Sequence, residues 1–327
     1  MQTVRVTERA TFKRCRRKWR YQSLMELVPR AEPRGALWLG TGVHYGLEQY
    51  YRNGTDPWVA AQEWLDLKLP ELNLGDMWPE ERAQFNETTD LMASILVGYI
   101  PFAQEYDDFE VVGVEENLEV HVPGTRVKLG GKLDLITRRG AKRHLWPLDH
   151  KTAARYIDIV NLEMDDQCTA YLWLLWQTSG EMPAGMLYNE LRKKIPAQPE
   201  ILVNGSLSKK KNVDTTYEIY LQAIKNNGLD PASYKDILEF LKNRPDGFYR
   251  REAIARTKYE LEHFAENLVP EVKAMNSKNT PLYPSPTRDC SWDCQYRDLC
   301  LCETTGGDLD SLIESLYEFA PGGRREI

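Results

Sequence analysis

Hydrophobic positions in the first half of the chain change their period once. Apolar residues recur at helical spacing over residues 7–27 and 39–51, and further helix is expected as far as about residue 106. Beyond that point the chain alternates apolar and polar residues, or runs apolar and β-branched, in three stretches: residues 110–122, 126–137 and 143–149. Turn-forming pairs at Pro123-Gly124 and Arg139-Gly140 separate these stretches. The pattern predicts helices followed by an antiparallel meander of three strands.

The second half of the chain returns to helical spacing and contains one more expected strand. A buried helix is expected over residues 161–178, ended by Gly180, and a strand over residues 184–191. Residues 204–278 are polar and helical in pattern, and a proline-rich link beginning at residue 281 leads to a group of cysteines and an acidic tail. This order predicts an α/β protein with a small mixed β-sheet flanked by helices.

Length and composition favour one folded unit. With 327 residues, 42% hydrophobic and 28% charged, the chain can bury a large core. We expect a single domain over residues 1–327 with five parts: an N-terminal helical part (1–104), a core (105–195), a second helical part (196–280), a cysteine-rich metal-binding segment (281–304) and a flexible tail (305–327). The start lacks the apolar segment of a signal peptide, and no apolar run could cross a bilayer. A cytoplasmic protein without a membrane partner is expected, in the host cytoplasm if a virus encodes it.

Charge is distributed unevenly along the chain. The net charge of −7 argues weakly against a nucleic-acid partner, but six cations lie between Lys13 and Arg20, and a lysine triplet occupies residues 209–211. Local basic patches of this kind can bind phosphates on an acidic protein. Both clusters also fit a solvated helix face, which is the favoured interpretation for the triplet.

An acid and a lysine lie two residues apart in Asp149-His150-Lys151, at the end of an expected strand. This spacing places both side chains on one face of a sheet. The same tripeptide pattern occurs at residues 66–68 and 271–273, but in helical stretches, where positions two apart point in different directions. Only the strand copy can bring its acid and amine together.

A second acid, Asp134, lies in an otherwise apolar strand, where an ionised carboxylate is costly to bury without a partner. If the Gly140–Arg143 turn is the centre of a hairpin, Asp134 and Asp149 face each other across two strands. Two carboxylates this close repel, and a divalent metal commonly keeps both ionised. The alternative is that the two acids are unrelated and are satisfied by lysines or water.

These motifs together resemble the PD-(D/E)XK nuclease superfamily. Gly-x-x-Asp on one strand followed by Asp-x-Lys on the next resembles its core, and further residues resemble the RecB-like branch. His44 in Gly-Val-His is similar to a helical metal ligand, Gln167 and Tyr171 are similar to a Gln-x-x-x-Tyr helix motif, and Glu115 or Glu116 fits an acidic position on the first strand. Taken singly, His44 also suits an ordinary helix histidine and Tyr171 a core tyrosine.

The resemblance implies a restriction-endonuclease-like core and a hard divalent cation, Mg²⁺ or Mn²⁺. Its implied ligands are His44, Asp134, Asp149 and the main-chain carbonyl of His150. The implied catalytic residues are Asp134, Asp149, Lys151, Gln167 and Tyr171. Lys151 would position or deprotonate the attacking water, or neutralise the phosphate, while the glutamine and tyrosine orient Lys151 and the DNA backbone.

Six cysteines in an expected cytoplasmic chain favour metal ligation over disulfides, since four of them lie within residues 290–302. The arrangement resembles RecB-like nucleases of the AddB and CRISPR-adaptation types, which implies a [4Fe–4S] cluster on Cys15, Cys290, Cys294 and Cys300 that joins the two chain ends. Three residues separate the second and third of these cysteines where the family has two, and Cys302 is an extra thiol. Zinc and unliganded reduced thiols are the alternatives, and Cys168 fits a small core residue.

The resemblance further implies an exonuclease that acts on DNA ends, with single-stranded DNA among its substrates, in recombination, repair or replication. Residues implied to bind DNA are Arg14, Arg16, Arg17 and Lys18. The sequence has no Gly-x-x-x-x-Gly-Lys-Ser/Thr loop, so a helicase or recombination partner would be a separate chain. Two other hypotheses stay open, namely a catalytically silent DNA-binding protein on the same scaffold and a zinc-stapled protein without a nucleic-acid role.

Overall fold

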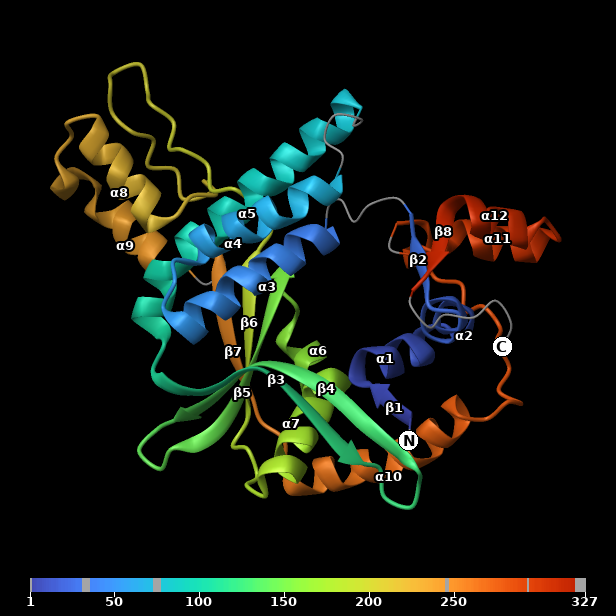
Figure 1. Cartoon of the computed structure of the whole chain (residues 1–327). Coiled ribbons are helices and arrows are strands. Elements are labelled where there is room, and N and C mark those ends of the chain that lie inside the picture. Colours follow the sequence, from blue (N-terminus) through green and yellow to red (C-terminus); the bar gives the residue numbers. More distant parts are fainter. Residues whose placement is uncertain (1, 31–35, 73–77, 245–246, 293, 321–327) are drawn as a thin grey trace.

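The computed structural model describes residues 2–30, 36–72, 78–244, 247–292 and 294–320 (Figure 1). Its α-helices are α1 (Val6–Arg14), α2 (Arg16–Trp19), α3 (Ala36–Asn53), α4 (Pro57–Lys68), α5 (Pro79–Tyr106), α6 (Ile159–Glu163), α7 (Asp166–Ser179), α8 (Tyr217–Asn226), α9 (Lys235–Asn243), α10 (Lys258–Met275), α11 (Arg297–Thr305) and α12 (Leu309–Leu316). Its strands are β1 (Gln2–Arg5), β2 (Leu27–Pro29), β3 (Phe109–His121), β4 (Val127–Arg139), β5 (His144–Ala153), β6 (Met186–Arg192), β7 (Tyr249–Ile254) and β8 (Tyr317–Phe319).

A six-stranded mixed sheet forms the centre of the molecule, with strand order β1-β4-β5-β6-β7 and with β3 also paired to β4. β3, β4 and β5 make the antiparallel meander that the alternating pattern predicts. β6 joins β5 in parallel after the crossover that carries α6 and α7, and β7 is antiparallel to β6. The predicted fold class, a small mixed sheet flanked by helices, is confirmed.

Helices cover both faces of this sheet (Figure 1). On one face α3, α4 and α5 pack around a core that includes Val43, Met92 and Leu96. On the other face α7 and α10 bury Trp173 and Phe264 against the sheet. α7 has clear end signals, since the Asp165 side chain accepts a hydrogen bond from the N–H of residue 168 and Gly180 ends the helix in the left-handed conformation. None of the described helices combines the length and apolar character needed to cross a bilayer.

Three parts of the fold differ from the pattern-based expectation. Residues 7–27 are not one helix, because Cys15 has an extended backbone (φ −159°) that separates α1 from α2. β7 interrupts the segment expected to be helical, because its charged residues gain their strand partners only from β6. The segment from residue 305, expected as a flexible tail, contains α12 and β8, whereas residues 321–327 lie outside the described residues.

The end of the described chain is attached to its beginning. β8 pairs antiparallel with β2, and Ile313 and Tyr317 are buried against Tyr21 and Leu27 in a small apolar cluster. This terminal lobe lies beside α2 and apart from the α3–α5 layer (Figure 1). Its core explains why this part of the tail is folded, because the apolar residues of α12, which recur at helical spacing, have a surface to cover.

Candidate active site

The candidate site lies where the neighbours of β4 separate. One edge of β4 pairs with β3, while the other edge pairs with β1 at residues 127–130 and with β5 at residues 135–139. Residues 131–134 lie between these two pairings, so Asp134 stands at the fork. The register of β4 and β5 places Asp149 at the position opposite Asp134. The two acids therefore occupy facing positions on diverging strands.

Both of these carboxylates are buried, with Asp134 7% and Asp149 4% exposed. Asp134 Oδ2 accepts a hydrogen bond from the main-chain N–H of His150 at 2.7 Å, and Oδ1 lies 3.4 Å from His44 Nδ1. Asp149 Oδ2 lies 2.7 Å from Lys151 Nζ. Two buried carboxylates with so few cationic neighbours favour the binding of an additional cation.

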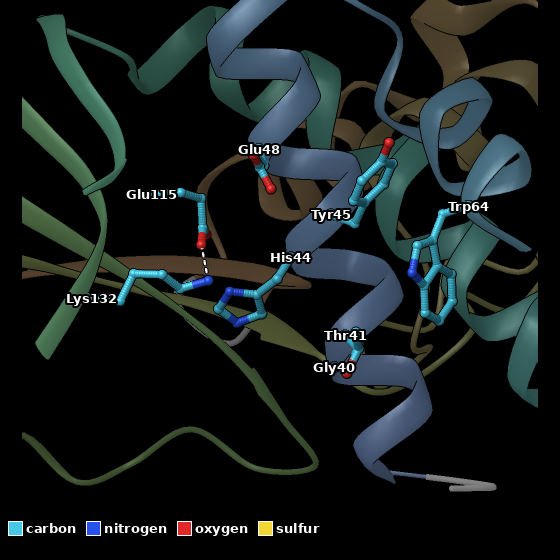
Figure 2. Close-up of a pocket in the computed structure, with 8 residues that line it drawn as sticks. All are labelled: Gly40, Thr41, His44, Tyr45, Glu48, Trp64, Glu115 and Lys132. Carbon is cyan, nitrogen blue, oxygen red and sulfur yellow. Dashed lines mark ion pairs between the residues drawn. The ribbon is translucent and has the colours of Figure 1, made fainter. Parts of the chain in front are cut away.

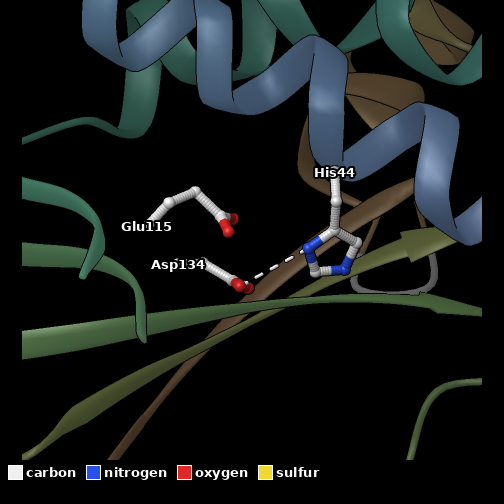
Figure 3. A group of neighbouring side chains, drawn as sticks. All are labelled: His44, Glu115 and Asp134. Atoms are coloured by element: carbon white, nitrogen blue, oxygen red, sulfur yellow. Dashed lines mark ion pairs between the residues drawn. The ribbon is translucent and has the colours of Figure 1, made fainter. Parts of the chain in front are cut away.

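A third acid reaches the site from β3. One ligand atom each of His44, Glu115 and Asp134 lie within 4.8 Å of one another, and Figure 3 shows the three side chains pointing toward a common point. Glu115 has a φ of 55°, in the left-handed region that non-glycine residues rarely adopt, although it lies within a 13-residue strand. Strained residues of this kind persist where the surroundings hold them, often at functional sites.

A cavity of 420 Å³ opens beside this group along α3 (Figure 2). It is lined by Gly40, Thr41, His44, Tyr45 and Glu48 of α3, by Trp64 of α4, and by Glu115 and Lys132 of the sheet. The Lys132 ammonium forms an ion pair with Glu115. Two of the candidate metal ligands, His44 and Glu115, are therefore accessible from a space that can admit a phosphate group.

Asp149 and Lys151 lie near the α7 residues that the sequence singled out. Gln167 Nε2 donates a hydrogen bond to Tyr171 Oη at 3.0 Å, as their spacing of four residues on one helix predicts. Burial, together with the negative charge of Asp149, raises the pKa of Tyr171 to about 12. Although burial alone would lower it, the adjacent Asp149 carboxylate raises the pKa of Lys151, so its ammonium stays charged.

The charges of the other site residues also depend on one another. Burial raises the pKa of Asp149 in spite of Lys151. Burial opposes ionisation of Asp134 as well, but the hydrogen bond and charge of His44, together with the charge and main-chain N–H of His150, outweigh it and lower the pKa of that carboxyl. The same contact raises the pKa of His44 against the effect of burial. Asp134 thus carries a full negative charge in the midst of the site.

His150 lies between Asp149 and Lys151 but turns its ring away from them. Its main-chain N–H bonds Asp134, while its ring is 2% exposed and stacks on Tyr51 of α3 at an interplanar angle of 25°. Burial lowers the pKa of this imidazole to about 3, so the ring is neutral. The residue therefore contributes to the site through its backbone.

A second cavity, of 490 Å³, is lined by four of the six cysteines: Cys15, Cys290, Cys294 and Cys300. The sulfur of Cys15 accepts hydrogen bonds from the main-chain N–H groups of Lys18 and Ser285, each at 3.4 Å. The sulfur of Cys290 accepts one from the N–H of Thr287 at 3.3 Å. Main-chain N–H groups therefore face two of the four sulfurs in this cavity. Of the six cysteines, all of them described, no three have sulfurs within 4.8 Å of one another.

The other two cysteines lie outside this cavity. Cys302 is on α11, with its sulfur beside Gly307. Cys168 is 1% exposed in the apolar core under α7, and burial raises the pKa of its thiol. All six thiols are free of disulfides. The structure thus separates four cysteines that share one space from two that do not.

The basic cluster over residues 13–20 contacts α11, near the end of the described chain. Arg17 Nη1 donates to Thr304 Oγ1 at 2.9 Å, and Arg20 Nη1 lies 3.0 Å from Glu303 Oε1. The other residues expected to bind DNA also have neighbours within the chain: Arg14 pairs with Asp289, Arg16 lies over the ring of Phe12, and Lys18 lines the cysteine cavity. A phosphate on this patch would compete with these internal contacts.

Acids at a strand fork, with a lysine two residues after the second acid, form the arrangement of metal-dependent nucleases that the resemblance implied. Residues 4–301 match the PD-(D/E)XK nuclease superfamily, and the chain belongs to this superfamily. It is similar to the solved structure of SSO0001 (12% identity, TM-score 0.33, 92% of this chain and 86% of that chain). It is also similar to a candidate exonuclease from Eubacterium rectale (13% identity, TM-score 0.37, 73% of this chain and 82% of that chain). No curated protein matches the sequence.

Two residues of the site were not singled out by the sequence pattern. Lys132 pairs with Glu115, and Glu48 lines the same cavity one helical turn after His44. The spacing of Glu48 from His44 was a usable signal, since positions four apart on a helix share a face. Nothing in the sequence pattern was a reason to place Lys132 in the site, because its ion pair with Glu115 depends on the left-handed backbone of Glu115.

Proposed function

We propose that this protein is a metal-dependent DNA nuclease of the RecB-like branch, acting as an exonuclease at DNA ends in recombination, repair or replication. The observation that carries the nuclease activity is the convergence of His44, Glu115 and Asp134 within 4.8 Å, beside the Asp149–Lys151 ion pair on the next strand. Membership of the superfamily supports DNA as the substrate. The preference for ends rests on the resemblance alone.

The side chains at the fork fit Mg²⁺ or Mn²⁺. Such ions prefer carboxylate and carbonyl oxygens, and one imidazole is compatible with manganese. His44, Asp134, Asp149 and the main-chain carbonyl of His150 would hold the ion. The structure groups Glu115 with His44 and Asp134, whereas Asp149 lies outside this group and pairs with Lys151. When bound, a divalent ion supplies Lewis acidity that activates water and offsets the charge of the phosphate.

Lys151 would bind the scissile phosphate or hold the attacking water by hydrogen bonding. Its raised pKa, caused by Asp149, favours this electrostatic role over proton abstraction. Gln167 and Tyr171, which are hydrogen bonded to each other, would orient Lys151 and the DNA backbone. Tyr171 stays protonated, since its pKa is raised to about 12, and can therefore donate a hydrogen bond to a phosphate oxygen.

We further propose a [4Fe–4S] cluster on Cys15, Cys290, Cys294 and Cys300. Its support is the cavity of 490 Å³ that these four cysteines share and the N–H donors around their sulfurs. A tetrahedral zinc site with bonds of about 2.3 Å needs sulfurs roughly 3.8 Å apart. No three of the described cysteine sulfurs lie within 4.8 Å of one another, and in a [4Fe–4S] cluster each thiolate binds a different iron. The cluster would join residue 15 to residues beyond 290 and make its insertion part of folding.

A cleavage assay tests the nuclease proposal. The full-length protein is incubated with linear single-stranded DNA, linear duplex and covalently closed circular duplex, with Mn²⁺, Mg²⁺ or a chelator. We expect linear DNA to be degraded only with metal, and closed circles to survive. A gel shift without cutting would favour the catalytically silent DNA-binding protein, and neither shift nor cutting would favour a zinc-stapled protein. Any helicase or recombination partner would be a separate chain.

A further inference from the structure

A buried polar network extends from the ring of His150 to both the helical layer and the far edge of the sheet. Its members are His150 on β5, Asn189 on β6, Arg251 on β7, Tyr51 on α3, and Tyr99 and Asp107 at the end of α5. His150, Asn189 and Tyr99 are each at most 2% exposed. None of these side chains has a role in the chemistry proposed above.

Asn189 is the direct partner of the His150 ring. Its Nδ2 lies 2.8 Å from His150 Nδ1, and its Oδ1 accepts a hydrogen bond from Arg251 Nε at 3.2 Å. Because a guanidinium can only donate, the amide oxygen must face Arg251 and the amide N–H₂ must face the imidazole. His150 Nδ1 is therefore the acceptor, and the proton of the neutral ring is on Nε2. The amide thus determines both the tautomer and the rotation of the ring.

Arg251 and the two tyrosines hold this amide in place. Arg251 Nη2 donates to Tyr99 Oη at 3.1 Å and Nη1 lies 2.8 Å from Asp107 Oδ1. Tyr51 Oη lies 2.7 Å from Tyr99 Oη and 2.9 Å from Asp107 Oδ2. The Tyr51 ring stacks on His150, so the network closes on itself around the imidazole.

The orientation of His150 fixes the positions of three groups of the site, namely Asp134, Asp149 and Lys151. Its N–H holds the Asp134 carboxylate at 2.7 Å, and its two neighbours in sequence are the acid and the lysine of the ion pair at 2.7 Å. A rotation of this one residue would move all three groups. Misplacement by about 1 Å can lower the rate of an enzyme about 100-fold.

Stability alone does not explain the network. His150 Nε2 is buried and makes no hydrogen bond with any described residue. An unsatisfied buried polar atom destabilises a fold, and well-packed apolar side chains are often as stable as buried ionic groups. A network kept despite this cost is expected to supply geometry instead.

We propose that Asn189, Arg251, Tyr99, Tyr51 and Asp107 are positioning residues that lock His150 and thereby set the geometry of the metal ligands. The proposal rests on the proposed function, since it concerns the same metal site. It predicts that weakening the network lowers metal affinity and turnover, while the binding of DNA is unchanged.

Tyr99→Phe is the test variant, and Tyr249→Phe is its matched control. Tyr99 is on α5 and Tyr249 on β7, their ring centroids lie 5.8 Å apart, and each substitution removes one hydroxyl. Tyr99 Oη bonds members of the network, whereas Tyr249 Oη donates to the main-chain carbonyl of Ile95 at 2.8 Å. Tyr51→Phe provides a second network variant if Tyr99→Phe does not fold.

Mn²⁺ binding is measured on the full-length proteins from the EPR signal of free Mn²⁺, without DNA, and melting temperatures are recorded without metal. For Tyr99→Phe we expect roughly tenfold weaker Mn²⁺ binding, the usual effect of losing an outer partner of a metal ligand. For Tyr249→Phe we expect less than about a twofold change in Mn²⁺ affinity. Its melting temperature should fall by about as much as that of Tyr99→Phe, because each variant loses one hydrogen-bonded hydroxyl. With saturating Mn²⁺, kcat should fall for the network variants while KM for DNA stays constant.

The positioning role would be overturned if the network variants bound Mn²⁺ as tightly as the wild type. It would also be overturned if the control variant lost as much Mn²⁺ affinity as the network variants. A wild-type protein that binds Mn²⁺ but cuts no DNA would refute the proposed nuclease activity, while the ratio of affinities would still decide the positioning role. A wild-type protein that does not bind Mn²⁺ would overturn both proposals.

Discussion

The role of Glu115 gives the sharpest test of the site, because the sequence pattern allowed either Glu115 or Glu116 at this position. The structure brings only Glu115 into the group with His44 and Asp134. Replacing it with glutamine keeps the shape of the side chain and removes one negative charge. The substitution also leaves the Lys132 ammonium without its carboxylate partner, so a cation would remain near the metal position.

The magnitude follows from the distances. The ligand atoms of the group lie within 4.8 Å of one another, so this separation is an upper limit for the distance from a bound ion to the Glu115 carboxylate. At that distance Coulomb's law gives about 1.7 kcal/mol for a doubly charged ion and a unit charge, even at the dielectric constant of bulk water. The Glu115 side chain is only 9% exposed, so the effective dielectric constant is lower and the interaction stronger. We therefore expect Glu115→Gln to weaken Mn²⁺ binding at least about 20-fold, since about 1.4 kcal/mol corresponds to a factor of ten.

The assay compares Glu115→Gln with Glu116→Gln, which removes the same charge from the next residue of the strand. Mn²⁺ binding is measured calorimetrically without DNA, and the Mn²⁺ concentration for half-maximal DNA cleavage is measured in parallel. Glu116→Gln should change both values by less than about threefold, because its screened charge is not part of the group. If the two variants weaken Mn²⁺ binding equally, Glu115 acts only through the general field and is not a ligand.

Four further predictions concern catalysis, stability and the cysteine cavity. Lys151→Met should slow DNA cleavage by about 100-fold or more with Mn²⁺ binding retained, and full activity in single-turnover assays would exclude Lys151 from the mechanism. Arg9→Met removes a buried guanidinium that lies 2.7 Å from Asp166, while Lys13 remains beside that acid. Because this second cation remains, we expect the free energy of unfolding to fall by about 2 kcal/mol, seen as a fall of about 3 °C in melting temperature. Burial opposes ionisation of Asp166, but hydrogen bonds from Arg9 and Lys13 lower its pKa. The stabilisation of the fold by these contacts is therefore complete above the ordinary pKa of an aspartate and is lost as pH falls through the lowered value. Asp166→Asn should flatten the acid side of the profile of unfolding free energy against pH, measured by urea denaturation. Cys300→Ser should abolish the iron content and brown colour of the purified protein, whereas Cys302→Ser should keep both, and iron loss in neither variant would reject the cluster.

Local patterns were sufficient to predict the centre of the fold. The change from helical to alternating spacing near residue 110 predicted the meander, and the turn near Gly140 predicted which residues of the two strands oppose each other. These predictions succeeded because alternation and turn chemistry act between residues close in sequence. The same register placed Asp134 opposite Asp149 without knowledge of any distant contact.

Edge strands and the tail were missed for the opposite reason. β7 has too few apolar residues to signal a strand, and it is one only because β6 offers an unpaired edge. β8 consists of three residues that pair with β2, almost 300 positions earlier in the chain. Pairing across such separations is set by packing of the whole molecule, which no local window contains.

The sequence by itself determined the kinds of groups available, namely acids and a lysine on neighbouring strands, a helical histidine, and cysteines near both ends. Tertiary structure decided which of them meet. It selected Glu115 through a left-handed backbone that the strand pattern does not encode. It also placed the His150 ring, which bonds Asn189 and stacks on Tyr51, beside a hydrogen-bonded network of side chains from β6, β7, α3 and α5. Residue types set the chemistry a side chain can perform, whereas distance and orientation, which decide whether it performs it, depend on contacts between elements far apart in the chain.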